Sequence, residues 1–210
     1  MFKQKPEVPI LRYNDSDATL VSKRTCYQGF FRLDEYKVSH KLFSGAQSPI
    51  IKREIFERGD AVVLIPYDPD KDAVVMIEQF RPGAMRFGGT PWLLEFVAGM
   101  FSENESPQDV AVREAKEEAN LNINEGDLTF VMKYLSSPGG MTEAIHLYAA
   151  SVDSTNVGGV YGLDCENEDI LVHAIPFDEA VSLLNDGKIT NAASVIGLQW
   201  LQLHRQSLGK

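Results

Sequence analysis

The sequence has little cysteine, little positive charge and no long hydrophobic run. Its two cysteines, Cys26 and Cys165, are widely separated and lack the spacing of metal ligands, so we expect reduced thiols and neither a disulfide framework nor a zinc site. Twenty Lys and Arg against thirty Asp and Glu leave a formal net charge of −10, which excludes a basic surface for a nucleic-acid backbone or an anionic membrane. The strongest apolar run, AVVLIP, is too short to span a bilayer.

The remaining composition predicts a folded protein, which we expect to be cytoplasmic. With 44% hydrophobic residues the chain can bury a full core, and no biased segment indicates disorder. The first residues, MFKQKPEVPIL, lack the charged start, apolar run and cleavage site of a secretory signal peptide. Because the chain is acidic, something in its site must lend positive charge if the substrate is anionic.

Two groups of strands are expected. Residues 19–58 carry aromatic and β-branched side chains in partial alternation, with turn signals at Gly29 and Gly45, and form a candidate small domain within residues 1–58. Residues 59–210 begin with a second strand pair, AVVLIPY and AVVMIEQF, and then interleave strands with helices. Such interleaving predicts an α/β (α+β) fold with a mixed β-sheet sandwiched between helices.

The stretch AVREAKEEANL, from Ala111 to Leu121, is typical of a helix with one acidic face. Glu114, Glu117 and Glu118 fall within about a third of the helical circumference. Taken alone, such charges favour a solvated helix surface. Like charges at these spacings nevertheless cost roughly 0.2 to 0.5 kcal/mol per pair, and a hard divalent cation held by the carboxylates would relieve that repulsion.

A longer pattern surrounds this helix. From Gly99 the chain reads GMFSENESPQDVAVREAKEEANL, which resembles the Nudix box, G-x5-E-x7-R-E-U-x-E-E-x-G-U, where U is a bulky apolar residue. Two positions depart from the box, since Ala115 is small for the first U and Asn120 replaces the closing glycine. Asn tolerates the left-handed backbone conformation, so it can still end the helix, which we expect Ser106 to begin as the N-cap.

Resemblance to the Nudix hydrolase family implies the Nudix fold and hydrolysis of a nucleoside diphosphate linked to another moiety. It also implies Mg²⁺ as the cofactor, with Mn²⁺ as a substitute. On this chain the resemblance makes Glu114 and Glu118 the main metal ligands, assisted by Glu117 and by the backbone carbonyl of Ala98. Arg113 would orient the glutamates by hydrogen bonding.

Further stretches resemble the bacterial ADP-ribose pyrophosphatases of this family along essentially the whole chain. They include YQGFF, KREIFERG, PWLLE, SSPGG and GLDCENEDI, and Pro138 matches a proline that marks the subfamily. The implied reaction splits ADP-ribose into AMP and ribose 5-phosphate. The resemblance places the general base on the loop GLDCENEDI, with Glu166 as the first choice and Glu168 as a supporting or alternative residue. On its own, ENED would be an ordinary acidic surface loop.

Five further side chains are candidates for substrate binding. The planar guanidinium of Arg81 can bind phosphate oxygens bidentately, although a lone arginine in a Gly/Pro-rich loop is equally compatible with a surface salt bridge. By resemblance Arg81 contacts the diphosphate and Glu143 lies near the terminal ribose. Phe30, Arg53 and Glu54 form the implied adenine-side set; without the resemblance they would be a β-domain core residue and two surface charges.

The ADP-ribose enzymes also resemble one another in being homodimers whose small β-domains exchange across the interface. Residues 19–58 fit this arrangement, because they are too few to bury a core alone. Two other functions stay open: a broader pyrophosphatase acting on other ADP-sugars or nucleotide cofactors, and a catalytically silent Nudix module that senses ADP-ribose. The complete set of carboxylates argues against the sensor, which would need neither metals nor a base.

Overall fold

The structure is a computed structural model that describes residues 10–102 and 104–208. The chain forms two compact units, one of Met1–Arg58 with Ser137–Thr142 and one of Gly59–Ser136 with Glu143–Lys210. Each unit is built around its own β-sheet. In the part of the chain that the structure describes, no helix is both long and apolar enough to cross a membrane.

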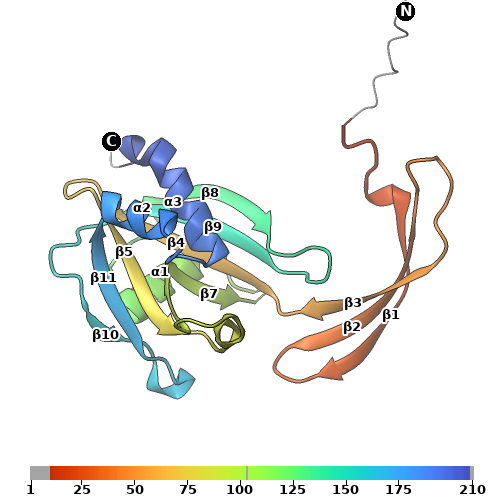
Figure 1. Ribbon diagram of the computed structural model, residues 1–210, viewed down its shortest axis with the longest axis horizontal. Helices are drawn as coiled ribbons and strands as arrows, with labels where there is room; N and C mark the ends of the chain where they lie inside the picture. Colours follow the sequence, from red (N-terminus) through yellow and green to blue (C-terminus); the bar gives the residue numbers. More distant parts are fainter. Residues whose placement is uncertain (1–9, 103, 209–210) are drawn as a thin grey trace, which may run out of the picture. The chain divides into compact units, whose positions relative to one another are not determined.

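The first unit holds a three-stranded antiparallel sheet in the order β1-β2-β3, coloured red to orange in Figure 1. The strands are β1 (Ala18–Gln28), β2 (Arg32–His40) and β3 (Ile51–Glu57), preceded by the 3₁₀ helix η1 (Asp15–Asp17). Charge holds the centre of this sheet: Asp34, 0% exposed, lies 3.0 Å from Lys23 Nζ and 2.9 Å from Arg32 Nε. All buried apolar side chains of the described residues lie from Ala61 onward, so this unit has little apolar core of its own.

The second unit contains an eight-stranded mixed sheet, in which β4 and β9 pair in parallel and the other neighbours are antiparallel. Its order is β10-β11-β5-β4-β9-β8, with β6 beside β5 and β7 beside β4. The strands are β4 (Asp60–Asp68), β5 (Ala73–Phe80), β6 (Trp92–Glu95), β7 (Val97–Phe101), β8 (Leu128–Leu135), β9 (Ala144–Ser151), β10 (Gly159–Tyr161) and β11 (Ile170–Pro176). Because β4 and β5 pair directly only through Tyr67 and Asp68 of β4, they separate further along, where β6 and β7 join them.

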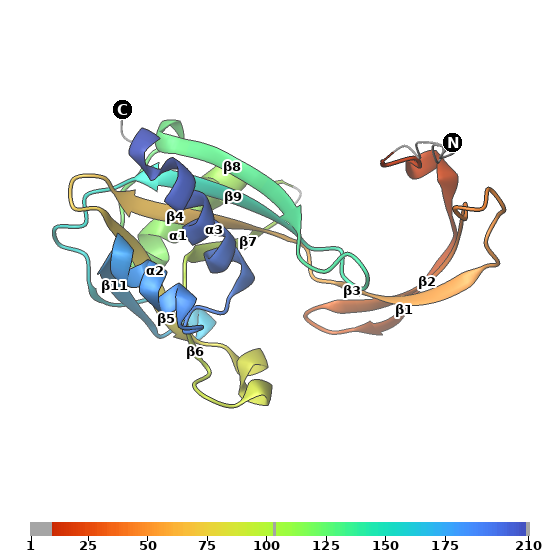
Figure 2. The ribbon, with the colours of Figure 1, turned by 45° about the horizontal axis from the view of Figure 1, so that its top comes forward.

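Helices cover both faces of this sheet, and Figure 2 shows α2 and α3 lying across one of them. The helices are α1 (Pro107–Ala119), α2 (Phe177–Asn185) and α3 (Ala192–His204), with the 3₁₀ helices η2 (Pro82–Phe87), η3 (Glu125–Asp127), η4 (Asp164–Glu166) and η5 (Arg205–Ser207). Ala115 of α1 shares one hydrophobic cluster with Val62 of β4, and Leu198 of α3 shares a second cluster with Val63. Since successive residues of β4 point to opposite faces, covering both faces buries most of the strand.

The architecture confirms the predicted α/β (α+β) fold class, with a mixed sheet between helices and a small N-terminal antiparallel β-domain. Helix α1 also begins and ends where the sequence predicts. The side-chain oxygen of Ser106 accepts a hydrogen bond from Asp109 N at 3.0 Å, and Asn120 closes the helix in the left-handed conformation, at φ 51° and ψ 28°. Asn191 caps α3, because its side chain accepts a hydrogen bond from Ser194 N.

Candidate active site

The acidic face of α1 lies against β7. Glu118 is 2% exposed, and its Oε2 accepts a hydrogen bond from the backbone N–H of Ala98 at 2.9 Å. The side chains of Glu114 and Glu117 are 13% and 27% exposed. The three glutamates therefore do not form the solvated helix surface that charge alone favours. They form a partly buried cluster whose position is fixed by the strand that precedes the helix.

Gly99 of β7 makes room for one of these carboxylates. A Cβ atom at this position would lie 2.1 Å from Glu114 Oε1 and 2.4 Å from Glu114 Cγ, far inside van der Waals contact. The backbone of Gly99 does not adopt a positive φ. The glycine is thus explained by the close approach of Glu114 and not by a turn.

Arg113 holds two of the glutamates. Its Nη1 lies 3.0 Å from Glu114 Oε1 and donates a 2.7 Å hydrogen bond to Glu117 Oε2. The family resemblance predicts hydrogen bonds from Arg113 to the glutamates, and their role in orienting metal ligands stays a prediction. With those bonds formed, no group of three or more His, Cys, Asp or Glu among the described residues is arranged around a ready-made cation position.

The chemistry of this cluster nevertheless fits a hard divalent cation. The pKa of Glu118 is raised to about 8 and that of Glu114 to about 7; burial is the largest cause, and the charge of Glu168 contributes to both. Carboxylates that are crowded and desolvated in this way are destabilised as anions, and a cation neutralises them. Oxygen donors of this kind are those that Mg²⁺ and similar ions prefer.

The loop after β10 brings two more carboxylates to α1. Glu166 ends η4 and is exposed, and its charge contributes to the raised pKa of Glu114. Glu168 is half-buried, and its Oε2 accepts a hydrogen bond from Leu163 N at 3.1 Å, which closes the loop on itself. Gly162 N donates to the carbonyl of Glu117 at 3.3 Å and ties the loop to the helix. The charges of both predicted base candidates therefore act on the glutamates of α1.

Arg81 lies just after β5 and faces the same cluster. Its Nε and Nη2 each lie 2.8 Å from Oε2 of Glu95, a carboxylate that is 3% exposed. Oε1 of Glu95 accepts a 2.8 Å hydrogen bond from Asn191 Nδ2 at the start of α3. The positive charge of Arg81 lowers the pKa of Glu118, against the larger effect of burial. The salt bridge of Arg81 is thus made to a buried group, and its side chain is still 42% exposed.

Sequence reasoning missed Glu95 and Asn191 as parts of this arrangement. Glu95 stands in the stretch PWLLE, where its only signal is a charge at the end of a buried strand. Asn191 is a residue type that favours helix caps, and it does cap α3. One side chain performs both tasks, because its oxygen caps α3 and its nitrogen bonds Glu95.

The remaining predicted residues are not brought to this cluster within one unit. Phe30, Arg53 and Glu54 belong to the first unit, where all three are exposed and Phe30 is 87% exposed. Phe30 is therefore not a core residue of the β-domain. Glu143 lies in the second unit, immediately before β9, and is 6% exposed. Burial is the main cause of the raised pKa of Tyr134, and the charge of Glu143 adds to it.

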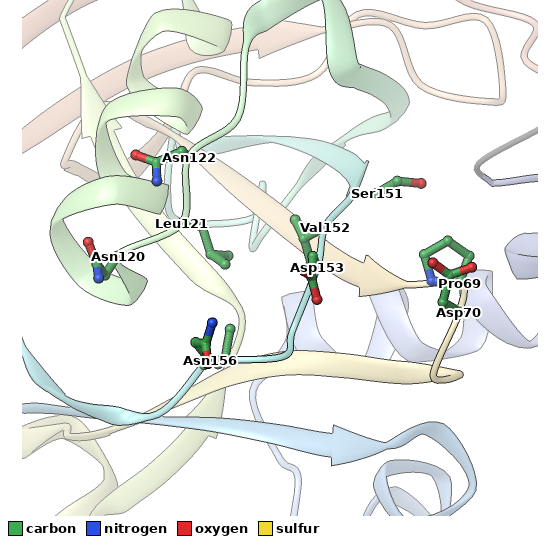
Figure 3. A pocket seen from close by; sticks show the side chains of 10 residues that line it. Pro69, Asp70, Asn120, Leu121, Asn122, Ser151, Val152, Asp153 and Asn156 are labelled. Carbon is green, nitrogen blue, oxygen red and sulfur yellow. The ribbon is translucent and has the colours of Figure 1, made fainter.

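A cavity of about 710 Å³ lies elsewhere, beyond the C-terminal end of α1 (Figure 3). Asn120, Asn156 and Asp153 are among its lining residues, and none of the predicted site residues lines it. Asp153 already pairs with Lys71 at 3.1 Å. Cavity size therefore does not locate the chemistry here; the buried carboxylates and Arg81 do.

Comparisons with known proteins identify the family. The NUDIX domain matches residues 57–196. The chain is 48% identical over 204 residues to an ADP-ribose pyrophosphatase of Escherichia coli K12, covering 97% of both chains, and 42% identical over 210 residues to an ADP-ribose pyrophosphatase of Haemophilus influenzae, covering 99% of this chain and 96% of the other. The crystal structure of an ADP compounds hydrolase shares the fold, with a TM-score of 0.68 at 21% identity over 92% of this chain and 96% of that one. The chain belongs to the NUDIX domain family.

Proposed function

We propose that this protein hydrolyses the diphosphate of ADP-ribose to AMP and ribose 5-phosphate. The observation that carries the proposal is similarity over nearly the full length, since the 48% identity to an ADP-ribose pyrophosphatase covers 97% of the chain and includes both units. The site supports it, because a cluster of buried carboxylates beside an arginine is suited to a phosphate anhydride and a divalent cation.

In the proposed enzyme, Glu114, Glu117 and Glu118 hold the divalent cation together with the backbone carbonyl of Ala98. We assign Mg²⁺ as the physiological ion and Mn²⁺ as a substitute. When bound, the cation activates a water and neutralises the charge that develops on the diphosphate. Arg113 keeps the carboxylates oriented, as its bonds to Glu114 and Glu117 indicate.

Glu166 is the proposed general base. It is exposed at the end of η4 and close enough to Glu114 for their charges to interact. Glu168 has a supporting role, because its carboxylate is already bonded to Leu163 N and holds the loop in shape. Arg81 binds the diphosphate through the N–H groups that its bonds to Glu95 leave over, since a guanidinium carries five donors.

The proposed enzyme is a homodimer whose β-domains, residues 1–58, exchange between partners. The β1 strand supports this, because it is exposed along its entire length and carries Leu20 at 53% and Tyr27 at 66% exposure. An uncovered strand that exposes apolar side chains in this way needs a partner surface. Phe30, Arg53 and Glu54 then bind the adenine side of the partner's substrate, and Glu143 lies near the terminal ribose. A chain without residues 1–58 that bound ADP-ribose normally would contradict the shared pocket.

Two exposed, free cysteines, Cys26 and Cys165, agree with a reducing compartment, and we place the enzyme in the cytoplasm. The assay for the proposed function is incubation of ADP-ribose with Mg²⁺ and chromatographic separation of the products. Equal amounts of AMP and ribose 5-phosphate are expected, with none formed when EDTA removes the metal. Binding of ADP-ribose without turnover would indicate a sensing module instead.

A further inference from the structure

A buried amide without a partner lies close to the candidate site. Gln79 of β5 is 7% exposed, and its side-chain nitrogen Nε2 is buried without a hydrogen-bond partner. Folded proteins bond nearly all such donors, because an unpaired buried amide has given up its bonds to water and gained none. A leucine of similar size would fill the same space without this cost. Packing alone therefore does not explain a glutamine here.

Strand geometry directs Gln79 to the face of the sheet that carries α1. Alternate residues of an extended strand point to the same face. Ile77, two residues earlier, belongs to the hydrophobic cluster formed with α1. Arg81, two residues later, still has an extended backbone. Its side chain donates a hydrogen bond to Glu95, and its charge lowers the pKa of Glu118. Gln79 thus stands between the core under α1 and the arginine at the carboxylate cluster.

The nearby carboxylates already have donors. Glu95 accepts hydrogen bonds from Arg81 and Asn191, and Glu118 accepts one from Ala98 N. A further N–H beside an arginine is suited to an anionic oxygen that the ligand brings. A diphosphate supplies several such oxygens, each able to accept more than one hydrogen bond.

We propose that Gln79 is a substrate-binding residue whose side-chain N–H donates to a non-bridging oxygen of the substrate's diphosphate, next to Arg81. The inference rests on the proposed function only in placing a diphosphate at this site. Because every nucleoside diphosphate compound shares that group, the contact supports all substrates equally. The base and the sugar are recognised elsewhere.

The test compares three variants. Gln79→Leu keeps the volume and removes the donor, and Gln79→Glu keeps the shape but turns an acceptor toward other carboxylates. Val75→Ala, on the same strand face and 0% exposed, is the control for a loss of core packing. For Gln79→Leu we expect kcat/KM to fall about 10- to 100-fold, the range for a lost hydrogen bond to a charged group, and we expect a melting temperature equal to or above that of the wild type. Gln79→Glu should lose at least as much activity, whereas Val75→Ala should lose stability and keep KM.

A panel of ADP-ribose, ADP-glucose, FAD and GDP-mannose separates this inference from the proposed function. Gln79→Leu should lower kcat/KM by the same factor for each compound that the wild type hydrolyses. Turnover of another member but not of ADP-ribose would refute the proposed substrate and still test Gln79. Calorimetric titration with ADP and Mg²⁺ needs no turnover, and Gln79→Leu should weaken binding there about 10-fold or more. Unchanged kcat/KM and ADP affinity, a loss confined to one substrate, or a loss that merely follows stability as in Val75→Ala would each overturn the inference.

Discussion

Replacing Gly99 with alanine should damage the active site without damaging the fold. The new Cβ would lie 2.1 Å from Glu114 Oε1, and ordinary van der Waals contact begins near 3.4 Å, so the carboxylate must retreat by more than 1 Å. The atoms in the way belong to a flexible glutamate side chain and not to the backbone. The strand backbone accepts alanine, which is intrinsically better than glycine within a strand by roughly 0.5 to 1 kcal/mol.

The expected loss follows from that displacement. A misplacement of about 1 Å in a catalytic group can cost about 10²-fold in rate, so Gly99→Ala should reduce turnover of ADP-ribose by about that factor at low Mg²⁺. Part of the loss should be recovered at high Mg²⁺, because the displaced carboxylate weakens the hold on the cation. Any stability change should be about 1 kcal/mol or less, which is a shift of roughly 2 to 4 °C in melting temperature for a chain of this size.

Initial rates across a Mg²⁺ titration, with a thermal melt of each variant, provide the assay. Gly126→Ala is the matched control, because nothing lies within 4 Å of its new Cβ, and both measurements should stay at wild-type values. Gly197→Ala is the control for a substitution that disturbs the core and not the metal site. Its Cβ would lie 2.7 Å from Phe96 in the core, so it should lower the melting temperature while the enzyme that stays folded keeps its metal dependence. Wild-type metal dependence in Gly99→Ala would refute the placement of Glu114 at the cation.

Four further predictions concern the carboxylates. Glu118→Gln should lower the rate of hydrolysis at low Mg²⁺ by more than ~10- to 100-fold, which is the loss typical when a residue that only hydrogen-bonds to a metal ligand is mutated. In the wild type, metal titrations should show affinity rising as the pH passes through about 7 to 8, because the cation must displace protons from groups whose pKa is raised; no such rise would contradict the assignment. Glu166→Gln should cut kcat by about 10²- to 10⁴-fold with little change in KM, and the same result in Glu168→Gln alone would move the base there. Burial raises the pKa of Asp68, but hydrogen bonds from Ser154 and Lys71 outweigh it and lower the pKa, so the ionised carboxylate stabilises the fold at pH values above its unfolded pKa. Asp68→Asn should therefore lower the free energy of unfolding in urea by roughly 2 kcal/mol at pH 7 and by progressively less below about pH 4. An equal loss at pH 3 would refute this.

The parts of the site that depend on local sequence could be predicted. Three carboxylates at i, i+3 and i+4 share one helix face whatever surrounds them, and Ser106 and Asn120 mark the ends of that helix by their own backbone preferences. Arg113, four residues before Glu117, reaches it for the same geometric reason. Local periodicity is sufficient for each of these contacts.

Contacts made across the fold could not be predicted. Glu95 meets an arginine 14 residues away and an asparagine 96 residues away, because the sheet opens between β4 and β5 and α3 begins at that opening. Nothing in the local sequence distinguishes Gln79 from an ordinary strand residue, since its missing partner is a property of the packed site. The short strand β10 has no clear strand signal in its sequence, because its glycine masks the pairing that β11 provides.

The solvent exposure of side chains in the first unit could not be predicted from the sequence either. Phe30 is an apolar residue of a type usually found in cores, yet it is 87% exposed. Every residue of β1 is exposed as well. The charge network around Asp34 replaces an apolar centre there. The exchanged homodimer that we propose would cover these surfaces, and local sequence patterns carry no signal for such a contact.

The central claim is that ADP-ribose is the substrate, and kcat/KM for ADP-ribose and GDP-mannose in the same Mg²⁺ buffer tests it most directly. The two compounds share the diphosphate and differ in both base and sugar, so metal and phosphate binding contribute equally to each. We expect ADP-ribose to be preferred by at least about 10-fold, a difference of roughly 1.4 kcal/mol in transition-state stabilisation, with AMP as the nucleotide product. Equal values, or a preference for GDP-mannose, would contradict the assignment while leaving the carboxylate site in place.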